Sequence, residues 1–111
     1  MLDTVYSPQR RNRVIPLRIT GHATTPVVAE GGQHIASITR DGAGDYDIVF
    51  KQAFGRIPVI VASNEGTVGG ISSVTDVSAT GFTLKMTTHA GVASDFNSHL
   101  IVWGFDAAEQ S

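Results

Sequence analysis

Cysteine is absent from this chain of 111 residues, so neither a disulfide scaffold nor a thiolate metal site can form. Charged residues make up only 16% of the chain, whereas hydrophobic residues reach 41%. No apolar run approaches the ~18 residues that cross a bilayer, and the first eight residues lack the apolar core of a signal peptide. We therefore expect one soluble domain, made in a cytoplasm and kept there or released by lysis.

Helical periodicity is also missing, because no segment of helical length places apolar residues at i, i+3, i+4 and i+7. Short apolar runs separated by Gly, Asn, Asp and Pro recur instead, and this predicts strands. The expected strands are residues 13–19, 33–40, 45–50, 57–63, 70–78, 81–87 and 99–105, with a further short one at 26–29. About six to eight short strands favour an all-β fold, a single antiparallel β-sandwich.

The connections add detail to this prediction. Residues 78–81 are expected to form a tight hairpin in which Gly81 supplies a positive φ. In residues 70–78 apolar side chains recur at every third position, which fits neither a strand nor a helix, so we expect a bulge there. The longer loops 64–69 and 88–98 are rich in small residues, and binding is expected at loops of this kind.

Two of the expected strands are apolar on both faces. Residues 57–62 and 100–103 contain no polar side chain, and Pro58 suits the entry of a strand better than its middle. One face of each strand can fill the core, which leaves the other to be covered by a loop, by the N-terminal segment or, as we favour, by a second copy of the chain. The residues assigned to these core and oligomer faces are Ile57, Val59, Ile60, Val61, Ile101, Val102 and Trp103.

Charge divides the chain into two parts. Residues 1–20 carry four arginines against one aspartate, a net charge of +3, and residues 21–111 carry four basic against nine acidic residues, a net charge of −5. We expect residues 1–20 to form an extended basic arm that leads into the first strand, and residues 21–111 to form the sandwich. Either Arg10, Arg11 and Arg13 bind an acidic partner, or the arm is a solvated tail.

Catalytic and metal-binding patterns are scarce. The four histidines lack metal-ligand spacing, and the best candidate set, His89, Asp95 and His99, reads more simply as polar loop residues. The aspartates of residues 41–47 lack the spacing of an EF-hand and are expected to lie in a solvated turn. No nucleophile elbow or stacking platform for nucleic acid is present. We expect no enzyme activity, cofactor, metal, nucleic acid or membrane partner.

A family resemblance rests on the order of several strand-and-turn motifs, which spans about residues 33–106. The motifs are Asp45-Tyr46-x-Ile48-x-Phe50-Lys51-Gln52-x-Phe54, Ile57-Pro58-Val59-Ile60-Val61, Val74-x-x-Val77-Ser78-x-x-Gly81-Phe82-Thr83-Leu84 and Ile101-Val102-Trp103-Gly104-Phe105. In this order the chain resembles the small β-sandwich domains of bacteriophage virion proteins, including tail-fibre tips, and the related H-type lectin fold. The resemblance implies a homotrimer that assembles through hydrophobic sheet faces.

Two functions follow as expectations from this resemblance. The first is a virion structural protein, made in the host cytoplasm, that binds the major capsid protein or another virion protein as a capsid decoration or cement protein. A chain that begins at Met1, is complete at Ser111 and carries an arm suits this role better than a tail-fibre tip, which normally ends a long chain. The alternative is a carbohydrate- or receptor-binding module, with His89, Asp95 and Asn97 as the loop residues that contact a glycan.

Overall fold

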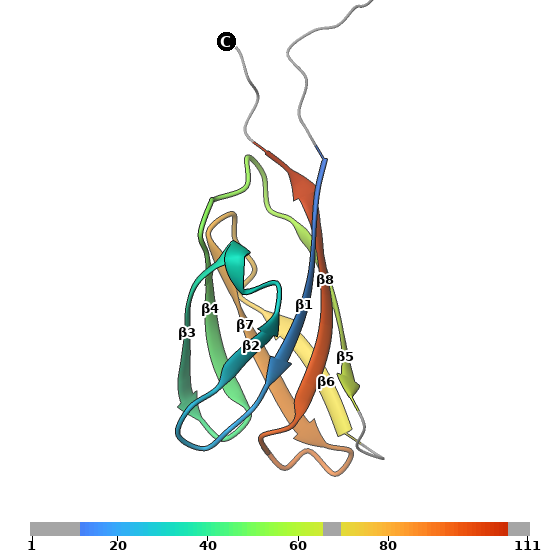
Figure 1. Ribbon diagram of the computed structural model, residues 1–111. Helices are drawn as coiled ribbons and strands as arrows, with labels where there is room; N and C mark the ends of the chain where they lie inside the picture. Colours follow the sequence, from blue (N-terminus) through green and yellow to red (C-terminus); the bar gives the residue numbers. More distant parts are fainter. Residues whose placement is uncertain (1–11, 66–69, 107–111) are drawn as a thin grey trace, which may run out of the picture.

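The computed structural model describes residues 12–65 and 70–106, and these form two packed sheets (Figure 1). The first sheet has the strand order β2-β1-β8-β5 and the second β3-β4-β7-β6, and all pairs of neighbouring strands are antiparallel. The predicted all-β sandwich is therefore confirmed. The elements are β1 Asn12–Thr20, β2 Val27–Glu30, the 3₁₀ turn η1 Gly32–His34, β3 Ile35–Gly42, β4 Asp45–Phe50, β5 Val59–Glu65, β6 Gly70–Thr75, β7 Gly81–Thr88 and β8 Asn97–Phe105.

Alternation of side chains along each strand explains the core. In β1 the buried residues Ile15, Leu17 and Ile19 alternate with exposed ones, and in β8 the buried Leu100 and Val102 do the same. The buried side chains of both sheets meet in one interior. Among the described residues, no helix is long and apolar enough to span a membrane.

Most predicted strand limits differ from the observed ones by one or two residues. The start of β3 moves to Ile35 because residues 32–34 form the 3₁₀ turn, which follows Gly31 at φ 83°. Pro58 immediately precedes β5, as expected for a residue without an N–H donor. The bulge predicted in residues 70–78 is wrong, because β6 pairs with β7 in unbroken register over Gly70–Thr75. The irregular step is Asp76, which adopts φ 51° directly after the strand.

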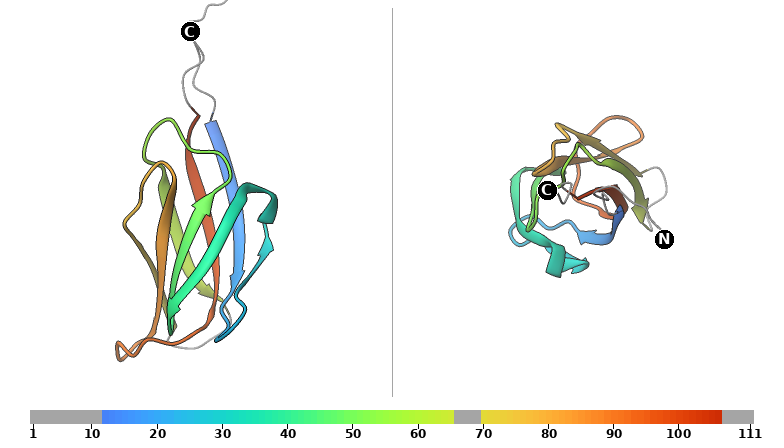
Figure 2. Two further views of the ribbon diagram at one scale, coloured as in Figure 1. Left: turned by 90° about the vertical axis from the view of Figure 1, so that its left-hand side faces the viewer. Right: turned by 90° about the horizontal axis from the view of Figure 1, so that it is seen from above.

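The strands β1 and β8 form the centre of the first sheet and run antiparallel over nine residue pairs, from Asn12–Phe105 to Thr20–Asn97. The start of β1 and the end of β8 therefore lie at the same end of the molecule (Figure 2). We call this the Phe105 end and the opposite one the Asn97 end.

The tight turn at residues 78–81 is present, but the reason for its glycine differs from the prediction. The Ser78 N–H donates to the Gly81 carbonyl oxygen at 2.9 Å, and Ser78 Oγ accepts from the N–H groups of Thr80 and Gly81, each at 3.2 Å. Gly81 is not among the residues with positive φ. A Cβ at this position would lie 2.2 Å from the carbonyl oxygen of Ile48, so the constraint is the close approach of β4.

Gly81→Ala is expected to destabilise the fold by about 1–3 kcal/mol, because the added methyl group collides with backbone that cannot rotate away. Gly81→Asn should cost at least as much, since a tolerance of positive φ does not relieve the collision. Gly32→Ala is the control, because nothing lies within 4 Å of a Cβ there. Urea denaturation of the three variants measures this, and a stable Gly81→Asn variant would contradict the close-approach explanation.

Candidate functional site

The outer face of the first sheet carries a continuous patch of exposed apolar side chains. Cross-strand pairing places Val14, Trp103 and Val59 side by side in one row, and the adjacent row consists of Pro16, Ile101 and Val61. These two rows, together with Phe105 beside Asn12, are called the apolar face below. Trp103 is 47% exposed and Val61 64% exposed, so one copy of the chain leaves this surface in water.

The apolar face is larger than expected from apolar residues that are scattered singly over a protein surface. Side chains of these types at the observed exposures present on the order of 600 Å² of apolar surface, which is at the upper limit for the largest patch on a typical monomer. It also approaches the roughly 800 Å² that each partner buries in a standard protein interface. Ile57, which precedes β5 and is 67% exposed, adds to the apolar surface at the Phe105 end.

A polar row borders the apolar face toward the Asn97 end. Arg18 and His99 are paired across β1 and β8, and Glu65 of β5 reaches both of them. Glu65 Oε1 lies 3.5 Å from Arg18 Nε and 2.9 Å from His99 Nε2. Glu65 therefore links Arg18 and His99, and these three residues, called the polar row below, span three strands of one copy.

A cavity of about 370 Å³ opens at the β2 side of the same outer face. β2 pairs with β1 only at residues 18–20, so the chain leaves the sheet after Glu30. Residues 30–34 then line one side of the cavity, and residues of β1 and β8 line the other. Gly31 makes the close approach possible, since a Cβ there would lie 2.4 Å from the carbonyl oxygen of Pro16. The lining residues are Pro16, Leu17, Arg18, Glu30, Gly31, Gln33, His34, His99, Leu100 and Ile101.

The residues predicted for the core and oligomer faces divide between the two sides of the sheet. Val102 is fully buried and Ile60 packs partly buried against the core. The other members, Ile57, Val59, Val61, Ile101 and Trp103, are exposed. Sequence reasoning omitted Val14 and Pro16, although both lie on the side of β1 opposite the buried residues 15, 17 and 19.

Arg13 does not belong to an extended arm. It lies in β1, and its guanidinium packs over the Phe54 ring at 3.9 Å and donates to the carbonyl oxygens of Gln52 and Ala53, each at 3.1 Å. Its Nε also lies 2.7 Å from Asp106 Oδ1. These contacts hold the Arg13 side chain against its own domain. Arg10 and Arg11 lie outside the described residues.

The predicted ligand loop is held together by structural contacts of Asp95. Its carboxylate accepts hydrogen bonds from Arg40 Nε at 3.2 Å and Arg40 Nη2 at 2.9 Å, from the Gly44 N–H at 2.9 Å and from the Tyr46 hydroxyl. His89 lies exposed in the turn after β7, whereas Asn97 is the first residue of β8. Asp95 therefore fastens the loop to β3 and β4.

The same contacts determine the protonation states of Asp95 and Tyr46. Two hydrogen bonds from Arg40 hold the pKa of Asp95 well below its usual range, with further lowering by Tyr46 and Gly44. Burial and the nearby Asp95 carboxylate raise the pKa of Tyr46 to about 12, so its hydroxyl stays protonated and remains a donor.

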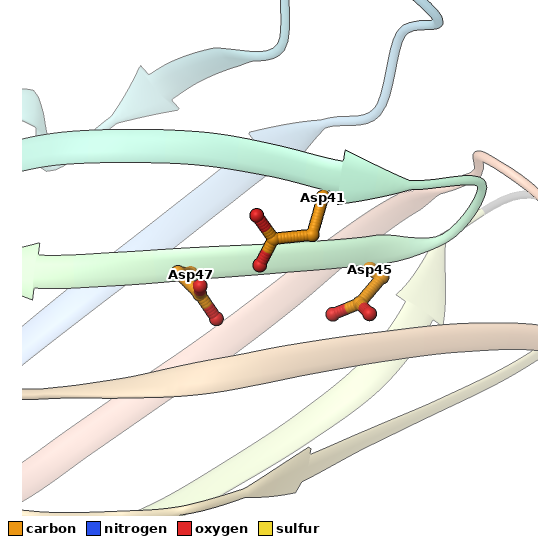
Figure 3. Close-up of side chains that lie close together, drawn as sticks. All are labelled: Asp41, Asp45 and Asp47. Atoms are coloured by element: carbon orange, nitrogen blue, oxygen red, sulfur yellow. The ribbon is translucent and has the colours of Figure 1, made fainter.

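A cluster of three aspartates lies on the outside of the second sheet (Figure 3). Carboxylate oxygens of Asp41, Asp45 and Asp47 lie within 4.8 Å of one another, a spacing that suits hard cations. A hydrogen bond between Asp41 and Asp47 raises the pKa of Asp41 and lowers that of Asp47. Lys85 Nζ lies 3.2 Å from Asp45 Oδ2, so a cation of the protein already partly balances this cluster.

Asp95→Asn is expected to lower the free energy of unfolding at pH 7 by about 2–3 kcal/mol, because charged hydrogen bonds with Arg40 are lost. The folded-state pKa of Asp95 lies below the unfolded value of about 3.9, so its contribution is present above that pH and is lost as the pH falls further. The gap between wild type and variant should therefore narrow below about pH 4. Urea denaturation at several pH values measures the gap.

Asp76→Asn serves as the control, because Asp76 is exposed and asparagine accepts its positive φ. A gap for Asp95→Asn that is the same at pH 7 and pH 3 would contradict the role given to the carboxylate charge.

No family model, curated protein or solved structure matches the chain.

Proposed function

We propose that this chain is a structural protein of a bacteriophage virion that decorates or cements the capsid as a homotrimer. The observation that carries the proposal is the apolar face, which one copy leaves exposed. Burial of apolar surface lowers the free energy by about 25 cal/mol per Å². Binding of a partner surface of matching shape to the apolar face is therefore strongly favoured. The proposal includes no catalytic activity.

A second copy is the partner that best suits the apolar face. The two apolar rows contain no charged side chain, so two copies can meet there without burying a charge. Rotation about an axis along the strands keeps each row at its own height, so that apolar rows meet apolar rows and polar rows meet polar rows. If the second copy is instead turned so that its strands run in the opposite direction, Trp103 of one copy faces the polar row of the other. This is avoided only where the two-fold axis passes through the apolar rows. Cyclic symmetry about the strand direction and a two-fold axis through the apolar rows both keep apolar side chains together, and the first of these is the symmetry of the proposed homotrimer.

The virion assignment rests on the motif resemblance, which implies sandwich domains that trimerise through hydrophobic sheet faces. Contact with the capsid is assigned to Arg10 and Arg11, because a guanidinium pairs bidentately with carboxylates of an acidic shell. Arg13 is left out of this proposal, because its guanidinium already contacts Phe54, Gln52 and Ala53.

The alternative, a carbohydrate- or receptor-binding module, has less support. Four hydrogen bonds from its own domain already occupy the Asp95 carboxylate, so the proposed glycan contacts reduce to His89 and Asn97. A rise in melting temperature with N-acetylgalactosamine, for the assembled protein, would favour this alternative.

Trp103→Ala is expected to weaken self-association by about 2–4 kcal/mol, roughly 30-fold to 1000-fold, because a large aromatic side chain at the centre of an interface contributes most to binding. The monomer should still fold, since Trp103 lies outside the core. Light scattering over a range of concentrations measures the mass, and circular dichroism checks the fold.

Ile71→Ala is the matched control, because Ile71 is 48% exposed on the second sheet. The proposal is contradicted by a wild-type protein that is monomeric at every concentration, or by equal association of Trp103→Ala and wild type.

The double variant Arg10→Glu/Arg11→Glu is expected to keep the melting temperature and oligomeric mass of wild type but to lose binding to capsid shells of the parent phage that lack this chain. Charge reversal places carboxylates against an acidic surface. Arg13→Glu should instead lower the melting temperature, because it removes the guanidinium from Phe54. Co-sedimentation with the shells measures binding, and undiminished binding of the double variant would remove the arm from the proposal.

A further inference from the structure

We infer that the cavity beside β2 is a socket for the β5 edge of a neighbouring copy, with Val61 as the side chain that enters it. The inference rests on the proposed self-assembly and adds which surface of one copy meets which surface of the next. The socket is the cavity of about 370 Å³ described above, whose lining includes Pro16, Ile101 and Glu30.

The socket and the β5 edge lie on opposite sides of one sheet face. In the strand order β2-β1-β8-β5 the socket opens at the β2 side, whereas Val59 and Val61 lie on the last strand at the other side. Two different surfaces on opposite edges make a head-to-tail contact, and a contact of this kind closes into a ring when the rotation per copy divides a full turn. A homotrimer is one such ring.

Height along the strands matches Val61 to the socket. Val61 pairs with Ile101, and Ile101 pairs with Pro16, and both of these partners line the socket. Rotation about an axis along the strands does not change height, so the Val61 of one copy arrives at the level of Pro16 and Ile101 in the next. Ser63, which pairs with His99, arrives at the level of the polar row.

The chemistry of the socket also suits this edge. Pro16 and Ile101, which the socket shares with the apolar face, supply apolar side chains at the level where Val61 arrives. The volume of about 370 Å³ is otherwise lined by polar side chains, those of Arg18, Glu30, Gln33, His34 and His99. The outward side chains of β5 at this height are Val59, Val61 and Ser63, so insertion expels water without carrying a charge into the socket. Val61 is among the most exposed large apolar side chains of the described residues.

Complementation between two defective variants tests the inference. Val61→Glu removes the entering side chain, and Gln33→Trp fills the socket from the exposed turn η1 without touching the core. Each variant alone is expected to be monomeric. A mixture should give a 1:1 heterodimer, because the intact β5 edge of Gln33→Trp enters the intact socket of Val61→Glu. Native mass spectrometry of the mixture, with one variant isotope-labelled, measures the stoichiometry.

Matched controls are Val49→Glu and Thr39→Trp, which place the same side chains on exposed positions of the second sheet and should keep the wild-type mass. The socket is overturned if wild type is oligomeric but either test variant keeps the wild-type mass, or if the mixture of variants stays monomeric. In both of those outcomes the proposed self-assembly survives. A monomeric wild type overturns the self-assembly and the socket together.

Discussion

A sandwich of two sheets has one interior, so a sheet that is apolar on both faces cannot be fully covered by a single copy of the chain. In β8 the buried Leu100 and Val102 alternate with the exposed Ile101 and Trp103, and period-two alternation sends these sets to opposite sides. The opposing sheet buries Leu100 and Val102, whereas Ile101 and Trp103 remain exposed to water. The apolar face is thus a direct consequence of strand geometry acting on an unbroken apolar run, and self-assembly is the way we propose that it is covered.

Polar contacts close the interior at its two ends, which leaves the apolar face as the main exposed surplus of the first sheet. At the Phe105 end, Arg13 covers the Phe54 ring and donates to two loop carbonyl oxygens. At the Asn97 end, the Asp95 carboxylate joins Arg40 and Tyr46 from neighbouring strands. Both arrangements combine a guanidinium with acceptors of its own chain, and such charged hydrogen bonds are stronger than neutral ones. These contacts stabilise the fold of a single copy.

The strands and their faces were largely predictable from sequence, because alternation is a local property. The inward direction of Arg13 was also available, since residues 13, 15, 17 and 19 share one side of β1. The Asp95 network was not, because Arg40 and Asp95 are separated by 55 residues and nothing in their local sequence links them. The cavity was hidden for a similar reason, since it depends on where β2 leaves β1 after the register shift between Arg18 and Ile19. Local patterns fix which way side chains point, whereas long-range pairing fixes what they meet.

The exposed β5 edge shows why a closed assembly is physically preferable to an open one. β5 is the last strand of its sheet and carries the exposed apolar side chains of Val59 and Val61, and apolar edge strands promote uncontrolled aggregation. Here Glu65 at the end of β5 is bound to Arg18 and His99, so the polar row limits sliding of one copy along another. A copy shifted by one row would press an apolar side chain onto these charges and lose their solvation. In the self-contact that we propose, matching heights favour one register, and that contact closes into a ring if the rotation per copy divides a full turn.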